Sequence, residues 1–291
     1  MVLDCLNKLT REFADSGSSS PRRDAELILA QVLNCETYQL YSKHDGDQTN
    51  LSLNQLTLIE NLAARRKRGE SVAYILGYRD FYKSRFEVGP GVLVPRPETE
   101  LLVDWGLKEF WSSPPKILDL GCGSGCIGLS LLLELPGSSL TAVDISSKAM
   151  EFAQKNAQKL QLTNRVDWFL GSVESFAQNS PSGAFDLVVA NPPYIDPEDP
   201  DVESGVRLFE PYEALFAPEK GFAAIKEFSN CALAQLSKTG VYLLEIGSGQ
   251  RPGLESWLCQ EWPQQLQVSF LKDYSGVDRI CKIKREERTN G

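Results

Sequence analysis

Short apolar segments alternate with helical patterns between residues 116 and 284, and this alternation constrains the fold of the 291-residue chain most strongly. Segments with the length and composition of strands lie at 116–120, 140–143, 166–170, 185–190, 241–246, 266–271 and 278–284. Helical patterns lie at 125–134, 147–160 and 219–237. Alternating strands and helices favour a parallel, doubly wound α/β sheet. The last two strands, joined by Asp273–Asp278, could form an antiparallel pair at its edge.

The first 77 residues carry no strand pattern and are predicted to form a small helical domain. Apolar residues recur there at helical spacing in the ranges 2–13, 25–33 and 56–63. Ser20 followed by Pro21 predicts an N-cap and a first-turn proline, and Ser52–Gln55 predicts a capping box. The helix that follows Ser52 runs into the basic segment Arg65–Arg68 and is expected to end at Gly69.

Residues 78–95 have a different composition from the helical segment. Strand-forming residues there are interrupted by Gly89-Pro90-Gly91, which predicts a β-hairpin with this connector. We therefore divide the chain into a helical domain at 1–77, a hairpin linker at 78–95 and an α/β domain at 96–291.

A glycine-rich turn follows the first strand of the α/β domain. Ile117–Leu120 runs into Gly121-Cys122-Gly123-Ser124-Gly125, where the first glycine permits a tight turn and the others let a ligand approach the backbone. A dinucleotide site is the alternative, but its spacing requires glycine or alanine where this chain has Cys126. The pattern, preceded by Asp119, resembles the first motif of class I S-adenosylmethionine methyltransferases.

Asp144 ends the next predicted strand. A carboxylate at this place can accept hydrogen bonds from both ribose hydroxyls of a nucleoside, and NAD sites use the same arrangement. A helix N-cap or a solvated acid is the structural alternative. The glycine turn favours the ribose interpretation.

The segment Asn191-Pro192-Pro193-Tyr194 directly follows the strand 185–190. An amide or exocyclic amino nitrogen is a poor nucleophile because its lone pair is delocalised. The Asn191 side-chain oxygen and the Pro192 carbonyl could hold its two N–H groups in one geometry, while the prolines fix the backbone. Tyr194 offers a flat face to the planar acceptor. A rigid proline turn is the alternative, but it leaves Asn191 and Tyr194 unexplained.

The chain resembles the HemK/PrmC family over nearly its whole length. The resemblance is carried by Gly91–Glu100 (GVLVPRPETE), by Asn191–Ile195 and by further segments, namely Ala73–Gly77, Phe81-Tyr82, Glu210-Pro211, Ala214–Phe216, Leu244–Gly247 and Asp273–Gly276. It departs at Ala217–Gly221, where the family has a glycine-rich stretch.

The resemblance implies a class I methyltransferase domain, Rossmann-like with a mostly parallel seven-stranded sheet, behind a helical domain that docks the substrate. It implies N5-methylation of the glutamine in the Gly-Gly-Gln motif of peptide chain release factors, with S-adenosyl-L-methionine as cofactor and S-adenosyl-L-homocysteine as product. Asn191, Pro192 and Tyr194 would be catalytic, and Pro193 would join them in binding substrate. Cofactor contacts would come from Gly121, Cys122, Gly123, Ser124, Gly125, Asp144, Ser172, Val173 and Asn191. Of these, Ser172 and Val173, which follow the third strand, would contact the adenine.

Two other acceptors share the Asn-Pro-Pro-Tyr motif: a glutamine of a ribosomal protein, and the N6 amino group of adenine in nucleic acid. The net charge of −9 lies wholly in residues 96–291, which hold 18 basic and 27 acidic residues. Seven acidic residues and one basic residue occupy 196–213, directly after the motif. A phosphate backbone would be repelled there, which favours a protein substrate.

The remaining features indicate a cytoplasmic enzyme without a metal. We find no secretory signal, membrane-spanning run or C-x-x-C pair. Cys122 and Cys126 flank the glycine turn at a spacing that favours packing over redox chemistry. His44, the one histidine, is expected on the surface. Arg65–Arg68 could contact an acidic partner or simply form a solvated helix end.

Overall fold

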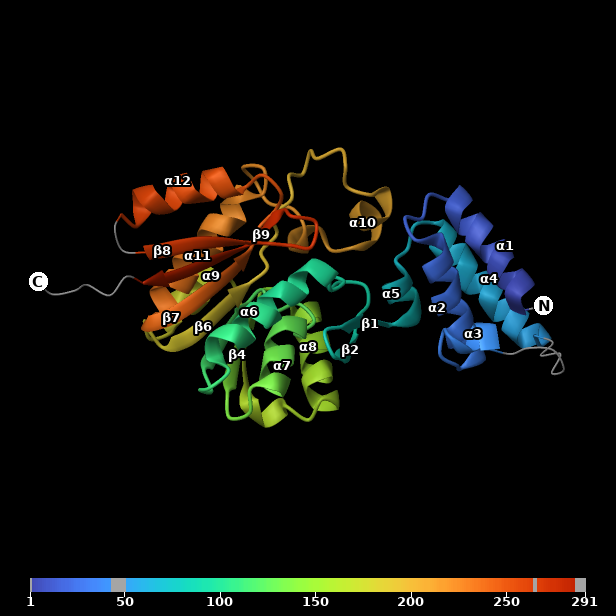
Figure 1. Ribbon diagram of the computed structural model, residues 1–291, viewed down its shortest axis with the longest axis horizontal. Helices are drawn as coiled ribbons and strands as arrows, with labels where there is room; N and C mark the ends of the chain where they lie inside the picture. The colour runs from blue at the N-terminus through green and yellow to red at the C-terminus, as the bar shows by residue number, and fades with distance from the viewer. Residues whose placement is uncertain (1, 43–50, 264–265, 286–291) are drawn as a thin grey trace, which may run out of the picture. The chain divides into compact units, whose positions relative to one another are not determined.

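The computed structural model describes residues 2–42, 51–263 and 266–285, so the prediction for His44 lies outside the described residues. The chain divides into two compact units (Figure 1). The first unit contains residues 1–78 and 201–210, and the second contains residues 79–200 and 211–291. The sequence pattern did not indicate that residues 201–210 belong with the N-terminal helices.

The first unit is helical, as predicted. Its helices are α1 Val2–Asp15, α2 Pro21–Leu33, α3 Gln39–Ser42, α4 Leu53–Lys67, α5 Val72–Leu76 and α10 Ser204–Phe209. Leu6, Phe13 and Ile28 are fully buried in its core, because the apolar positions of α1 and α2 recur on one helix face. The capping box at Ser52 is confirmed: Gln55 N–H donates to the Ser52 hydroxyl, and the Gln55 side chain accepts from Ser52 N–H.

The predicted cap at Ser20 is only half correct. Pro21 does open α2, but no side-chain hydrogen bond from Ser20 caps this helix in the described chain. The Ser18 hydroxyl instead accepts from Ser20 N–H at 3.1 Å and donates to the Asp24 carboxylate at 2.7 Å. Asp24 in turn pairs with Arg66 of α4, so this helix start is held by a tertiary contact.

The α10 segment packs closely against the N-terminal helices of its own unit. Gly205 of α10 meets Gly69 so closely that a Cβ on Gly205 would lie 2.3 Å from the Gly69 carbonyl oxygen. Two glycines are therefore needed where these backbones cross.

The hairpin turn lies elsewhere than predicted. Its strands are β1 Tyr78–Phe81 and β2 Ser84–Glu87, so the turn is Tyr82-Lys83 rather than Gly89-Pro90-Gly91. Tyr82 has a φ of +54°, unusual for a tyrosine. Its N–H donates to Glu100 at 2.9 Å and its hydroxyl to Asp104 at 3.2 Å, so α6 (Glu100–Phe110) holds this turn.

The second unit is built on a seven-stranded sheet in the order β5-β4-β3-β6-β7-β9-β8. Its strands are β3 Lys116–Leu120, β4 Ser139–Asp144, β5 Val166–Leu170, β6 Phe185–Ala190, β7 Leu236–Glu245, β8 Leu266–Lys272 and β9 Asp278–Arg285. The first five strands in chain order pair in parallel, and β9 pairs antiparallel with both β7 and β8. This confirms the doubly wound sheet and the antiparallel terminal pair.

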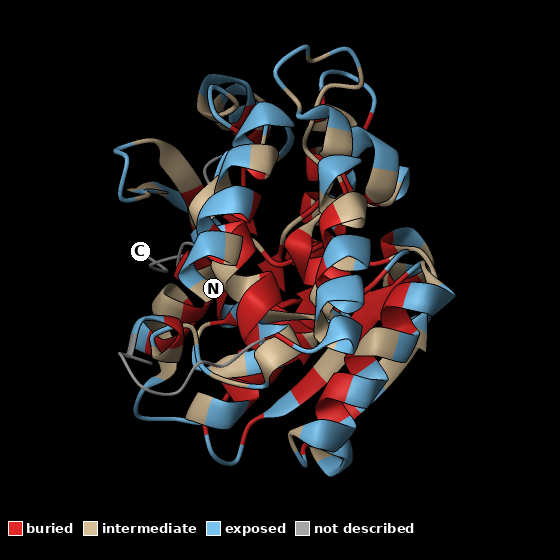
Figure 2. Cartoon of the chain, turned by 90° about the vertical axis from the view of Figure 1, so that its right-hand side faces the viewer, coloured by how far each residue is buried: buried red, intermediate tan, exposed pale blue. Residues whose placement is uncertain are grey.

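Helices cover both faces of this sheet (Figure 1). One apolar cluster joins α6, α7 (Cys126–Glu134) and α8 (Ser147–Lys159) to the sheet, and the other joins α9 (Val173–Asn179), α11 (Phe222–Gln235) and α12 (Arg251–Glu261). Successive β3 side chains alternate between the clusters, because neighbouring residues of a strand point to opposite faces. Figure 2 shows the buried residues concentrated in the strands between the helices. Helices α9 and α12 were not predicted from the sequence.

Candidate active site

The glycine turn and the acceptor segment begin at the same level on adjacent strands. Leu120 of β3 pairs with Ala190 of β6, so Gly121 and Asn191 each follow a paired residue. The strand order reverses between these strands, since β4 and β5 lie on one side of β3 while β6 and β7 lie on the other. Open α/β sheets bind ligands at the carboxyl ends of strands at such a reversal.

Three glycines give the turn its shape. Gly121, Gly123 and Gly125 have φ angles of +70°, +56° and +78°, a region that other residues rarely adopt. Gly121 N–H donates to the Val143 carbonyl at 2.8 Å, which ties the turn to the end of β4. A Cβ on Gly123 would have Val92 as its nearest neighbour, at 4.0 Å, so it would enter open space beside the turn. Bare backbone therefore forms the surface there, as a closely approaching ligand requires.

The other side chains of the turn are buried. Cys122 and Ser124 are almost fully buried as whole residues, so Gly121 and Gly123 present most of the accessible surface of the turn. Burial raises the pKa of the Cys126 thiol to about 12 and the pKa of the Cys122 thiol well above its usual value. Both thiols join the core cluster beneath α7, which confirms packing as their role over redox chemistry.

Asp144 connects the turn to the end of β4. Its Oδ2 accepts from Gly123 N–H and its Oδ1 from Ser146 N–H, both at 2.8 Å. Ser146, not Asp144, caps α8, because its hydroxyl accepts from Ala149 N–H at 3.2 Å. Burial raises the pKa of the Asp144 carboxyl, while these backbone donors act against that rise. A carboxylate has about four acceptor positions, so these backbone donors leave acceptor capacity for the hydroxyls of a ribose.

Ser172 and Val173 lie beside Asp144 but have structural roles. Gly171 N–H donates to the Asp144 carbonyl at 2.9 Å, which holds this turn against β4. The Ser172 hydroxyl accepts from Ser175 N–H and caps α9, while the Val173 side chain is buried in the core. Their contact with an adenine stays a prediction, and backbone atoms are what they can contribute. The bare turn and the Asp144 carboxylate together suit a nucleoside ligand with an amino-acid tail.

The side chain of Asn191 is held from one side. Its Nδ2 donates to the Thr99 hydroxyl at 3.2 Å, which leaves Oδ1 as the acceptor of that side chain. Thr99 is buried in the 3₁₀-helix Pro97–Thr99, directly before α6. The sequence marked Thr99 only as part of a segment resembling the HemK/PrmC family.

Tyr194 is held at both its hydroxyl and its carbonyl. Its hydroxyl donates to Glu245 Oε1 at 2.8 Å, and its carbonyl accepts from Gln250 Nε2 at 2.8 Å. Gly221, with a φ of +81°, lies so close that a Cβ there would be 1.9 Å from the Tyr194 carbonyl oxygen. Burial and the adjacent Glu245 raise the pKa of Tyr194 well above its usual value, so it remains a neutral phenol.

Four residues of this site were missed or left without a role by sequence reasoning: Thr99, Glu245, Gln250 and Gly221. An acidic residue at the end of the apolar run 241–246 was the available indication for Glu245. Gln250 acts on the backbone of a residue 56 positions away, which no local pattern reveals.

The segment Ala217–Gly221, which lacks the glycine-rich pattern of the HemK/PrmC family, has an unusual backbone conformation. Glu219, Lys220 and Gly221 all have positive φ, at +55°, +58° and +81°. This chain therefore places two ordinary residues in the left-handed region, at a cost of about 1–2 kcal/mol each. The Gln250 side chain also donates to the Lys220 carbonyl, at 3.2 Å.

Most of the basic segment in the first unit is already paired. Arg65 pairs with Glu70, Arg66 with Asp24 and Lys67 with Glu12 within the same unit. These side chains are therefore less available to an acidic partner than the sequence suggested.

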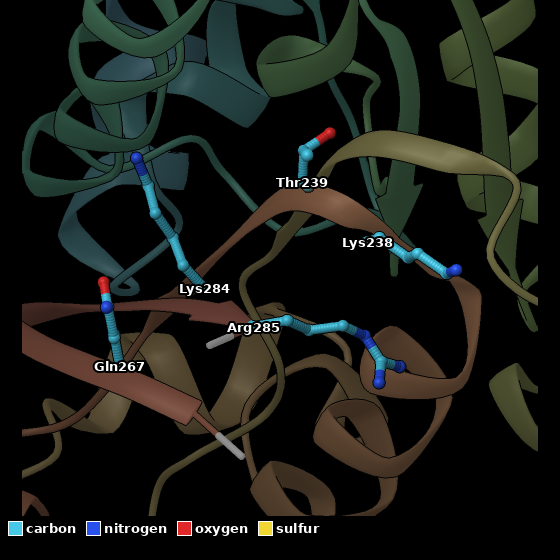
Figure 3. A pocket seen from close by; sticks show the side chains of 6 residues that line it. Lys238, Thr239, Gln267, Lys284 and Arg285 are labelled. Carbon is cyan, nitrogen blue, oxygen red and sulfur yellow. The ribbon is translucent and has the colours of Figure 1, made fainter. Parts of the chain in front are cut away.

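A cavity of about 300 Å³ lies at the other end of the strands of the sheet (Figure 3). It is lined by Lys238, Thr239, Gly240, Gln267, Lys284 and Arg285. Because β7 begins and β9 ends there, the cavity lies at the opposite end of the parallel strands from the glycine turn. Lys284 points away from Lys238 and Arg285 and pairs with Glu109, so the cations do not converge on one ligand position.

In residues 2–42, 51–263 and 266–285, no three His, Cys, Asp or Glu side chains are grouped as metal ligands would be. No helix within those ranges combines the length and apolar character of a membrane span.

Comparison with known proteins identifies both parts of the chain. The PrmC N-terminal domain family matches residues 4–77, and the methyltransferase small domain family matches residues 98–219. The catalytic domain of hMettl16, solved with the MAT2A 3'UTR hairpin 1, superposes with a TM-score of 0.55 at 12% identity, covering 90% of this chain and 92% of that one. This similarity supports the fold alone, a Rossmann-like class I methyltransferase sheet.

Relatives of similar length share one name, release factor glutamine methyltransferase. The protein from Rhodopirellula baltica is 33% identical over 98% of this chain and 96% of its own length. The protein from Vibrio cholerae is 37% identical over 94% and 93%, and that from Escherichia coli is 37% identical over 90% and 92%. With both domains matched and these identities extending over nearly the whole length, the chain belongs to the PrmC/HemK family of release factor glutamine methyltransferases.

Proposed function

We propose that this enzyme transfers the methyl group of S-adenosyl-L-methionine to the side-chain N5 of the glutamine in the Gly-Gly-Gln motif of peptide chain release factors. The position of Asn191–Tyr194 carries the proposal, since this segment directly follows β6 beside the glycine turn after β3. The names of the full-length relatives support a release factor as the protein that is modified.

S-adenosylmethionine, when bound, supplies an electrophilic methyl group on a sulfonium centre. The backbone of Gly121–Gly125 would hold its methionine part, and the remaining acceptor capacity of the Asp144 carboxylate would hold its ribose. The turn at Ser172-Val173, beside Asp144, is our proposal for the adenine contact.

Asn191 and Pro192 would orient the glutamine amide. The Asn191 Oδ1 and the Pro192 carbonyl each accept one of the two N–H groups, and Pro193 stiffens the backbone that presents them. Accepting these hydrogen bonds favours the nitrogen as it becomes tetrahedral and gains positive charge. Tyr194 would pack against the planar amide. Orientation of this kind can supply effective molarities of ~10⁵ M or more.

Charge favours a protein substrate over nucleic acid. Several acidic residues that follow the acceptor segment are exposed, namely Glu198, Asp201, Glu203 and Glu213. Binding through phosphates depends on neutralisation by Lys and Arg, and residues 196–213 hold one basic residue, Arg207, against seven acidic residues. We propose that the helical unit docks the release factor.

Mass spectrometry of a purified release factor, incubated with enzyme and S-adenosylmethionine, tests the proposal. We expect a gain of one methyl group on the Gly-Gly-Gln glutamine. An unmodified release factor beside a methylated ribosomal protein would assign the enzyme to that substrate instead. Salt-sensitive binding to DNA or RNA together with adenine methylation would assign it to nucleic acid.

Asn191→Ala tests the role of the acceptor segment. We expect methyl transfer to fall by at least about 1,000-fold, because removing one oriented hydrogen-bond partner of a transition state costs 10²–10³ and the freed amide also loses its alignment. Calorimetry should show S-adenosylmethionine binding largely retained. Equal losses of cofactor binding and methyl transfer would contradict the assigned role.

A further inference from the structure

Four polar side chains from three parts of one unit lie together at the acceptor segment. Thr99 comes from the 3₁₀-helix before α6, Asn191 and Tyr194 follow β6, and Glu245 ends β7. Glu245 and Thr99 are almost fully buried, at 1% and 2% exposed. Glu245 lies at this level because its neighbour Leu244 pairs with Ala190, the residue before Asn191.

The hydrogen bonds of this group form a nearly complete chain. Tyr194 donates to Glu245 Oε1 at 2.8 Å, and Asn191 Nδ2 donates to the Thr99 hydroxyl oxygen at 3.2 Å. The Thr99 hydroxyl lies beside the Glu245 carboxyl and acts to lower its pKa, as a hydrogen-bond donor does, against the larger opposing effect of burial. Glu245 Oε2 is buried and receives no regular hydrogen bond from the described residues, so it is the natural acceptor for the Thr99 hydrogen.

We propose that Glu245 is a positioning residue that acts through Thr99 to fix the amide of Asn191, and acts directly on Tyr194 to fix its ring. The inference rests on the proposed role of Asn191 in holding the glutamine amide. It assigns no contact with substrate to Glu245 or Thr99, because both are buried.

The acceptor oxygens of Glu245 set the direction of the whole chain. When Thr99 donates its one hydroxyl hydrogen to Glu245 Oε2, its oxygen can only accept from Asn191. Asn191 must therefore present Nδ2 to Thr99 and Oδ1 to the substrate. If the hydroxyl of Thr99 turned to donate to Asn191, the amide would rotate and present N–H groups to the N–H groups of the glutamine.

Glu245→Gln removes this directionality with little change in shape, because the glutamine amide can donate to Thr99. We expect kcat for methylation of a release factor to fall on the order of 100-fold, the size that a small misplacement of reacting groups can cause. The Kd for S-adenosylmethionine should change by less than about twofold, because the variant leaves the glycine turn and Asp144 untouched.

Thr99 provides a matched pair of variants. Thr99→Val keeps the shape of the side chain but removes the hydroxyl, and we expect a similar loss of kcat. Thr99→Ser keeps the hydroxyl and should restore most of the activity. The double variant with Glu245→Gln and Thr99→Val should be little worse than either single variant, because both changes interrupt one chain.

Tyr242→Phe is the control for loss of a buried hydroxyl on the same strand. Tyr242 of β7 is fully buried, and its hydroxyl lies 3.4 Å from that of Ser229. This variant should keep its kcat. If Glu245→Gln does not fold, the comparison of Thr99→Val with Thr99→Ser decides.

Full activity of Thr99→Val would overturn the proposal, as would equal activities of the Val and Ser variants. A wild-type enzyme that leaves the release factor unmodified contradicts the proposed function instead. The two failures are therefore distinguished by the wild-type reaction.

Discussion

The two halves of the candidate site are built differently. The glycine turn is shaped by its own residues and by the adjacent ends of β3 and β4, with Gly121 bonded to Val143 and Gly123 to Asp144. The acceptor segment is shaped by distant parts of the second unit, since Thr99, Glu245 and Gln250 each hold one of its groups. The first half therefore depends on local backbone conformation, and the second depends on tertiary contacts between side chains and backbone.

Gly221→Ala should have the largest effect in this comparison. Its Cβ would lie 1.9 Å from the Tyr194 carbonyl oxygen, so the backbone of the acceptor segment must move. We expect at least a 100-fold loss of methyl transfer, of the order that misplacement by 1 Å causes. Gly276→Ala is the matched control, because Gly276 has the same φ of +81° with no described atom within 4 Å of the added Cβ.

Initial rates and thermal melting of both variants separate the clash from the backbone strain. Gly276→Ala should lose only about 1 kcal/mol of stability and keep its activity. Equal activities in the two variants would show that the acceptor segment tolerates displacement by Gly221.

Gly123→Ala tests the local half of the site. The added Cβ would occupy the open space beside the turn, so affinity for S-adenosylmethionine should fall about 10–100-fold, corresponding to about 1.4–2.8 kcal/mol. Gly183→Ala is the control, since its φ is +70° and its nearest atom to a Cβ lies 3.9 Å away. Calorimetry that finds equal cofactor affinity in the two variants would contradict a close ligand approach at Gly123.

Asp119 makes the stability of the second unit dependent on pH. Burial raises the pKa of this carboxyl to about 7, although Gly128 N–H donates to it at 3.0 Å. The folded state therefore binds a proton that the unfolded state has released above pH 4, so this contribution is present at low pH and is lost as pH rises towards 7.

Asp119→Asn should remove that dependence. The wild type should lose roughly 2 kcal/mol more unfolding free energy than the variant between pH 5 and pH 7. Urea unfolding of the cofactor-free proteins at several pH values measures the difference. Parallel pH profiles for the two proteins would contradict the raised pKa.

Lys220→Gly should have the smallest effect, and it should increase the stability of the protein. Lys220 has a φ of +58°, so glycine relieves a strained backbone and should stabilise the protein by about 0.5–1 kcal/mol. Lys220 is preferable to Glu219, whose replacement would also remove an ion pair with Lys226. A lower melting temperature would show that the Lys220 side chain contributes more than the strain costs.

The sequence predicted best what is encoded locally. The strands of the sheet, the glycine turn and the capping box at Ser52 follow from hydrophobic spacing and turn chemistry. The hairpin was misplaced because Gly89–Gly91 has the composition of a turn, whereas Tyr82 is held in a left-handed conformation by Glu100 and Asp104. Glu245, Gln250 and Gly221 escaped prediction for the same reason: their partners are distant in sequence.

The membership of residues 201–210 in the first unit has a consequence for engineering by domain exchange. The chain passes between the two units at residues 78, 200 and 210, so the helical unit is discontinuous. A chimaera that replaces residues 1–77 alone would put a foreign residue opposite Gly205 at the position of Gly69, whose φ of +92° favours glycine. Residues 1–78 and the segment 201–210 should therefore be exchanged together in any chimaera.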